Sequence, residues 1–193
     1  CATMRQPRRL LDLVDLIVDE KKSVDAVLLL ARELESYGLF EESAGVLKRA
    51  LASEDMKRAG LLNPAFENAA WRGAFDEASD RLAELLSEES VTPRVWSVAA
   101  RVWWSVGQER RALDLIAQAA QRFPTEWEVA RVQADLLFKS GDRAGAEEVY
   151  VQALANSPSR ESVFKQMVST IRSDGMTDWL SSLLARGEAV LET

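Results

Sequence analysis

The amino-acid sequence predicts an all-α protein built as a stack of antiparallel helix pairs. Glycine recurs at a fixed period of about 34 residues, at Gly38, Gly73, Gly107, Gly141 and Gly175. About a dozen residues with the apolar spacing of an α-helix precede each of these glycines, and a similar stretch follows. Only five prolines occur among 193 residues, so long helices are possible. A repeat of this length is typical of folds in which each repeat is one helical hairpin.

Each periodic glycine is expected to close the first helix of a hairpin, because glycine readily adopts the left-handed conformation that ends helices. Mostly small residues occur seven positions before each glycine and five and twelve positions after it. Large apolar residues occur eleven and four positions before it and nine positions after it. In the third repeat the small residues are Ala100, Ala112 and Ala119, and the large residues are Trp96, Trp103 and Ile116. We expect the large side chains to pack against the small ones in one continuous core.

This pattern resembles the tetratricopeptide repeat, a helix–turn–helix family with a period of about 34 residues. The resemblance is carried by Trp96, Ala100, Trp103, Ala112, Ala119 and Pro124, and in the next repeat by Ala134, Ala146, Tyr150, Ala153 and Pro158. It implies a right-handed superhelical solenoid of about five repeats. We expect residues 1–23 to form an N-terminal tail and capping helix, and residues 24–193 to form a single repeat domain. The repeats are expected at 24–57, 59–92, 93–126, 127–160 and 161–193.

Two segments depart from the family pattern. Asn63-Pro64 falls inside the first helix of the second repeat, which should therefore start late or kink near Pro64. The last repeat has large residues where small ones are usual, as expected of a terminal cap. The apolar residues between Leu10 and Val18 predict an amphipathic helix that caps the first repeat. A helix that lies on a membrane is the alternative for this segment.

The composition disfavours several classes of function. A net charge of −7 is unfavourable for binding nucleic acid or an anionic membrane. The chain has no histidine and a single cysteine, Cys1, which excludes zinc sites of the usual nitrogen and sulfur type and Ser/His or Cys/His catalytic pairs. Adjacent carboxylates such as Glu41-Glu42 point about 100° apart on a helix and do not converge on one substrate atom. The sequence therefore predicts no enzyme activity, no metal and no cofactor.

The resemblance implies a concave groove lined by the first helix of each repeat, at 13, 10, 6, 3 and 2 positions before the glycine. In the central repeats aromatic rings lie beside arginines at these positions, and tryptophan and arginine are enriched at binding hot spots. The candidate partner-binding residues are Trp71, Arg94, Arg101, Trp104, Arg131, Asp135, Phe138 and Lys139. The alternative for Trp104 and Phe138 is packing against each other or against a neighbouring repeat.

A clamp for the acidic C-termini of chaperones is not predicted. In this family the clamp needs asparagine or arginine nine positions before the glycines. The residues at those positions are Leu29, Pro64, Val98, Val132 and Gln166.

The preferred function is a non-catalytic scaffold that binds a peptide or helix of a partner protein in the groove. A second hypothesis starts from Cys1-Ala2, which is compatible with the mature N-terminus of a lipid-anchored periplasmic assembly factor for a pilus, a secretion machine or a polysaccharide exporter. If residues 1–3 precede a native start at Met4, a cytoplasmic protein is expected instead. Contact with a membrane is expected only if Cys1 carries a lipid. An RNA-binding helical repeat is the third hypothesis, and the terminal repeats would permit a homodimer.

Overall fold

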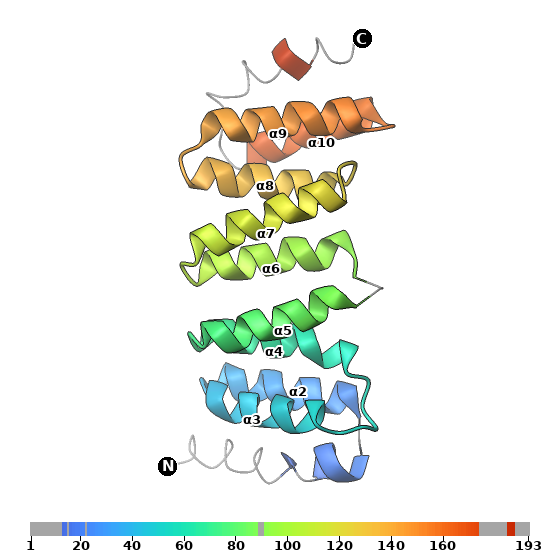
Figure 1. Cartoon of the computed structure of the whole chain (residues 1–193), viewed down its shortest axis with the longest axis vertical. Coiled ribbons are helices and arrows are strands. Elements are labelled where there is room, and N and C mark those ends of the chain that lie inside the picture. The colour runs from blue at the N-terminus through green and yellow to red at the C-terminus, as the bar shows by residue number, and fades with distance from the viewer. Residues whose placement is uncertain (1–12, 15, 22, 89–90, 174–184, 188–193) are drawn as a thin grey trace. The chain divides into compact units, whose positions relative to one another are not determined.

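The structure, a computed structural model, describes residues 13–14, 16–21, 23–88, 91–173 and 185–187. Every regular element in these ranges is a helix, so the predicted all-α class of antiparallel helix pairs is confirmed (Figure 1). The chain forms two compact units, Cys1–Val91 and Thr92–Thr193. Within the described part of the chain no helix has the length and apolar character needed to span a bilayer.

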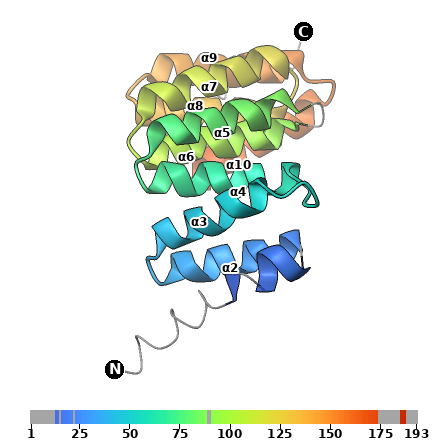
Figure 2. The ribbon, with the colours of Figure 1, turned by 60° about the horizontal axis from the view of Figure 1, so that its bottom comes forward.

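The N-terminal unit contains two hairpins. The first consists of α2 (Val24–Ser36) and α3 (Phe40–Leu51), and the second of α4 (Ala59–Trp71) and α5 (Phe75–Ser87) (Figure 2). A short π-helical segment, η1 (Leu16–Lys21), packs against α2 and α3 and buries Val18. The remainder of the predicted capping helix, from Leu10 to residue 12, lies outside the described residues.

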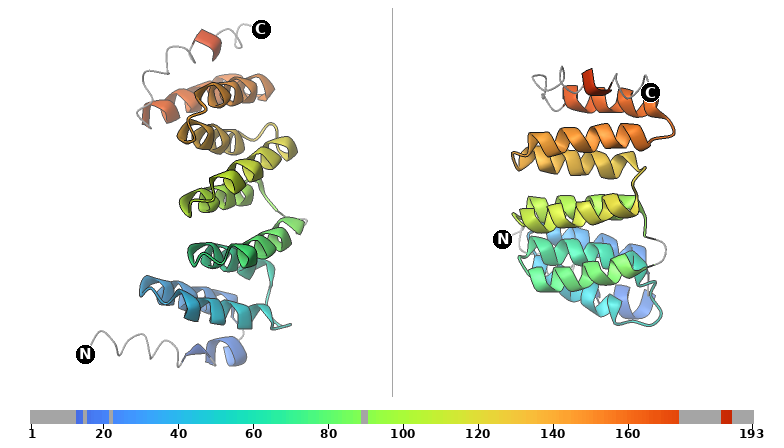
Figure 3. Two further views of the ribbon diagram at one scale, coloured as in Figure 1. Left: turned by 60° about the vertical axis from the view of Figure 1, so that its left-hand side comes forward. Right: turned by 45° about the horizontal axis from the view of Figure 1, so that its top comes forward.

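The C-terminal unit contains two complete hairpins and one further helix. The hairpins are α6 (Pro93–Ser105) with α7 (Glu109–Arg122), and α8 (Trp127–Lys139) with α9 (Arg143–Asn156). Helix α10 (Arg160–Ser173) packs against α9, and α8 packs against both α6 and α7 (Figure 3). The second helix expected in the fifth repeat falls mainly outside the described residues. Its described turn, residues 185–187, is joined to α9 by ion pairs from Arg186 to Glu147 and Glu148.

The four described periodic glycines close their helices in the same way. Gly38, Gly73 and Gly107 have φ of 76°, and Gly141 has φ of 92°. In each turn the glycine N–H donates to the carbonyl three residues earlier, and the next N–H donates to the carbonyl five residues before itself. This pair of hydrogen bonds is the Schellman motif. A Cβ atom added at any of these glycines would have open space, so the backbone conformation selects glycine here.

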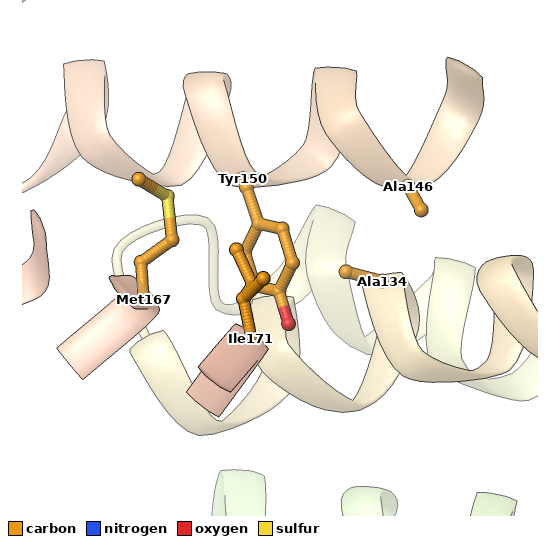
Figure 4. Close-up of a cluster of buried hydrophobic side chains, with 5 residues drawn as sticks. All are labelled: Ala134, Ala146, Tyr150, Met167 and Ile171. Carbon is orange, nitrogen blue, oxygen red and sulfur yellow. The ribbon is translucent and has the colours of Figure 1, made fainter. Parts of the chain in front are cut away.

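The large and small positions of the repeat meet in the core as predicted. Trp103 is 2% exposed, and Ala112 and Ile116 are fully buried. In the next repeat Tyr150 is buried between Ala134 and Ala146 of its own hairpin and Met167 and Ile171 of α10 (Figure 4). The indole ring of Trp127 stacks on Tyr150 with the ring centroids 5.6 Å apart.

The predicted late start of the second repeat's first helix is wrong. Helix α4 begins at Ala59 and includes Pro64 in its interior. Pro64 cannot donate to the carbonyl of Gly60, so α4 loses one backbone hydrogen bond. The turn before Pro64 nevertheless places Leu61 and Leu62 in the core, where both are fully buried. Burying two leucine side chains contributes about 3–6 kcal/mol, which offsets the roughly 3 kcal/mol that proline costs inside a helix.

A polar network joins the helices of the N-terminal unit. Asn68 is 2% exposed, and its Nδ2 donates to Glu35 Oε1 at 2.7 Å and to the carbonyl of Phe40 at 3.2 Å. Its Oδ1 accepts a hydrogen bond of 3.0 Å from Arg72 Nε. Three further residues extend this network to α3 and α5: Ser43, Glu41 and Glu77. The buried amide is thus satisfied by partners on α2, the α2–α3 hairpin and its own helix, which favours a single arrangement of the two hairpins.

Candidate functional site

Five of the candidate residues lie together in a hollow between α6 and α8, inside the C-terminal unit. The hollow encloses about 390 Å³ and is lined by Arg101, Trp104 and Ser105 of α6 and by Arg131, Asp135, Leu136 and Lys139 of α8. The spacing explains why these side chains meet. Arg131, Asp135 and Lys139 lie four residues apart and therefore share one face of α8. The same reasoning places Arg101 and Trp104, three residues apart, on one face of α6.

The basic groups of the hollow are joined to two carboxylates. Arg101 Nη2 donates to Glu128 Oε1 at 3.2 Å. Arg131 binds the same carboxylate, with Nη2 2.9 Å from Oε1 and Nε 3.1 Å from Oε2. Lys139 Nζ lies 2.8 Å from Asp135 Oδ2. The arrangement holds three cations against two carboxylates, so the hollow carries an excess of positive charge on an acidic chain.

The arginine side chains remain accessible to a ligand. Arg101 is 43% exposed and Arg131 is 27% exposed, even though both are bonded to Glu128. Ion pairs this accessible to solvent contribute little stability, typically about 0–1 kcal/mol. A competing carboxylate can therefore replace Glu128 at small cost. The planar guanidinium groups are suited to bidentate binding of such a carboxylate.

Trp104 provides an apolar surface beside these charges. Its ring is half-buried and lines the hollow, while Leu136, 1% exposed, contributes apolar atoms from α8. The hydroxyl of Ser105 donates to the carbonyl of Val102 at 2.7 Å, so this serine is satisfied by its own helix. An aromatic ring and a guanidinium group side by side can hold an apolar side chain and a carboxylate of one ligand.

The three other candidate residues lie elsewhere. Arg94 is exposed in the first turn of α6 and does not line the hollow. Phe138 packs against the hydrophobic cluster around Tyr150, and the guanidinium of Arg143 lies 5.4 Å from its ring centroid. Phe138 is half-buried there and does not line the hollow. Trp71 belongs to the N-terminal unit, where it is 54% exposed at the end of α4.

The candidate set does not contain three residues of this surface: Ser105, Glu128 and Leu136. Glu128 occupies the first groove position of its repeat, in the first turn of α8, and precedes Arg131 by three positions on the same helix. That spacing is a usable signal for an ion pair. Leu136 gives no such signal, because it lies five positions before Gly141, at neither a groove position nor a core position of the repeat. Among the residues that the structure describes, no group of three or more acidic, cysteine or histidine side chains could hold a metal ion.

No protein-family model and no curated protein matches the chain. Among solved structures, pilF of Pseudomonas aeruginosa is similar at 20% identity with a TM-score of 0.51, over 85% of this chain and 74% of that one. YrrB, described as a TPR protein with an unusual peptide-binding site, has 15% identity and a TM-score of 0.48, over 91% and 90%. MamA has 12% identity and a TM-score of 0.48, over 84% and 94%.

The pilF similarity, at this level of identity, shows the fold alone. It agrees with the helical hairpins and the regular recurrence of the glycine turns described above. The chain therefore has the tetratricopeptide-repeat fold.

Proposed function

We propose that this protein is a non-catalytic interaction scaffold that binds a peptide or helix of a partner protein, with the hollow between α6 and α8 at the centre of the binding surface. The observation that carries the proposal is the meeting of Arg101, Arg131 and Trp104, from two successive repeats, in one accessible hollow. Side chains of these types supply a large share of the binding energy at protein interfaces.

The chemistry of the hollow indicates which part of the partner it holds. The partner presents a carboxylate, from an acidic side chain or a C-terminus, to Arg101 and Arg131. An apolar side chain next to that carboxylate lies against the ring of Trp104. Glu128, whose side chain is 41% exposed, turns towards solvent when the partner's carboxylate takes its hydrogen bonds. The bound partner thereby keeps both guanidinium groups paired.

The test compares wild type with an Arg101→Glu/Trp104→Ala double variant. Each immobilised protein is incubated with native extract, and retained proteins are identified by mass spectrometry. The matched control is Arg110→Glu, which reverses the charge of an arginine 95% exposed on α7 and outside the hollow. Urea unfolding of each variant verifies that it is folded.

We expect wild type and Arg110→Glu to retain the same partner and the double variant to lose it. Loss of one hot-spot residue typically weakens binding by about 2 kcal/mol or more, which is at least about thirtyfold. Equal recovery by all three proteins would show that the hollow is not the binding surface.

A further inference from the structure

A second cleft lies in the C-terminal unit, lined by α7, the turn into α8, α8 itself and α9. It encloses about 290 Å³ and shares no residue with the hollow between α6 and α8. Its size is at the lower end of the range for ligand sites in proteins, which suits a short stretch of chain. The scaffold function proposed above does not use this surface.

The polar groups of this cleft are carboxamides. Gln121 of α7, Gln133 of α8 and Gln152 and Asn156 of α9 all line it. Gln152 Nε2 lies 3.2 Å from Glu148 Oε1. The other three amides make no hydrogen bond to any residue that the structure describes. Their donors and acceptors are therefore available to a ligand.

Among the residues that the structure describes, none with a charged side chain lines the cleft, although charged residues make up 28% of the sequence. A charged ligand would lose hydration on entering and would meet no opposite charge in return. This argues for an uncharged occupant. The cleft therefore suits a different ligand from the hollow between α6 and α8, where the arginines favour a carboxylate.

Several of the residues that lie between the amides have short side chains. Ala117 and Ala120 of α7, Ala130 of α8 and Ala153 of α9 line the cleft with side chains that end at Cβ. Beside these alanines a main chain can approach the carboxamides, and the remaining lining is apolar: Phe123, Pro124, Val129 and Val149. Each carboxamide carries both donors and an acceptor, as does each peptide group of an extended chain. The lining thus matches a peptide main chain in both charge and hydrogen bonding.

We propose that this cleft binds an extended, uncharged segment of a partner polypeptide through hydrogen bonds from Gln121, Gln133 and Asn156 to its main chain. The segment carries uncharged side chains, because charged groups would be unpaired in the cleft. The site is independent of the hollow between α6 and α8. One protein can therefore hold an acidic segment and a neutral segment at two separate surfaces of its C-terminal unit.

The experiment is a selection of random heptapeptides displayed on phage against the immobilised full-length protein. Enriched peptides are synthesised with blocked ends, and their affinities are measured by isothermal titration calorimetry. Ala120→Arg fills the cleft with a long side chain. Gln121→Ala/Asn156→Ala removes two amides while leaving the backbone unchanged. Gln118→Ala removes an exposed amide from the same helix outside the cleft and is the matched control.

We expect a group of enriched peptides without charged residues that bind wild type, Gln118→Ala and Arg101→Glu/Trp104→Ala equally. Their affinity should fall at least about tenfold in Ala120→Arg and about tenfold in Gln121→Ala/Asn156→Ala. The proposal is overturned if no uncharged peptide is enriched, or if enriched uncharged peptides bind both cleft variants as well as wild type. Acidic peptides that are lost only with Arg101→Glu/Trp104→Ala would support the hollow and not the cleft. Urea unfolding identifies any variant that fails to fold. If one cleft variant fails, the affinity of the peptides for the other cleft variant tests the proposal.

Discussion

At the residue scale, the first hairpin contains two glycines in opposite backbone environments. Gly38 has φ of 76° in the turn between α2 and α3, whereas Gly45 lies inside α3 with helical neighbours. Apart from the adjacent residues and, at Gly45, the backbone of its own helix, a Cβ atom at either position would meet no atom within 4 Å. Replacing them with alanine therefore isolates the effect of the backbone from that of packing.

Gly38→Ala should lower the free energy of unfolding by about 1–2 kcal/mol, because alanine is strained in the left-handed region. Gly45→Ala should raise it by about 0.5–1 kcal/mol, because glycine is unfavourable inside a helix. Urea unfolding followed by circular dichroism measures both changes. Changes of the same sign in the two variants would contradict the assignment of Gly38 to a left-handed turn.

The glycine turns could be predicted from the sequence because they depend on local conformation. The surroundings of other side chains could not be predicted from the sequence in this way. Trp104 and Phe138 both lie three residues before their glycines, yet Trp104 lines the hollow while Phe138 packs against the cluster that contains Met167 and Ile171. Their surroundings depend on what the next repeat contributes, and the register alone does not contain that information.

At the scale of helices, α4 shows how tertiary burial outweighs local propensity. Pro64 removes a hydrogen bond from the middle of the helix, and the sequence pattern therefore predicts a late start or a kink. The helix begins five residues earlier because Leu61 and Leu62 are fully buried. Its first turn is further fixed by Arg58, which donates to the carbonyl of Leu51 and pairs with Glu84 of α5. The Arg58–Glu84 pair joins residues 26 positions apart in sequence, so the periodicity could not reveal it.

Pro64→Ala should increase the free energy of unfolding by about 1–3 kcal/mol, because it restores the missing hydrogen bond and removes the cost of proline in a helix. Pro93→Ala is the control, since Pro93 occupies the first turn of α6, where proline is tolerated. Its replacement should change the stability by less than about 0.5 kcal/mol. Urea unfolding measures both, and a loss of stability in Pro64→Ala would contradict this account of α4.

At the scale of the whole molecule, charge decides which partners can approach. The net charge is −7, and the three cations of the hollow between α6 and α8 are offset by Glu128 and Asp135. A polyanion gains little there and is repelled by the remainder of the chain. A short acidic peptide meets only the local excess of positive charge. The hollow is therefore suited to a single carboxylate and unsuited to a phosphate backbone.

We expect no measurable binding of a fluorescently labelled single-stranded RNA at low or at physiological salt. Fluorescence anisotropy across a titration of the protein measures this, with a basic RNA-binding domain as the positive control. Binding to phosphates releases counterions and weakens steeply as salt increases. An anisotropy change at low salt that disappears at physiological salt would contradict this expectation.

The position of Glu128 has a consequence for the thermodynamics of partner binding. Its carboxylate already occupies Arg101 and Arg131, with hydrogen bonds of 2.9, 3.1 and 3.2 Å. For the acidic partner proposed above, binding would therefore be an exchange reaction, in which one carboxylate replaces another and the number of paired guanidinium groups stays the same. Under that proposal, discrimination among acidic partners would depend on the apolar surface that each of them buries against Trp104.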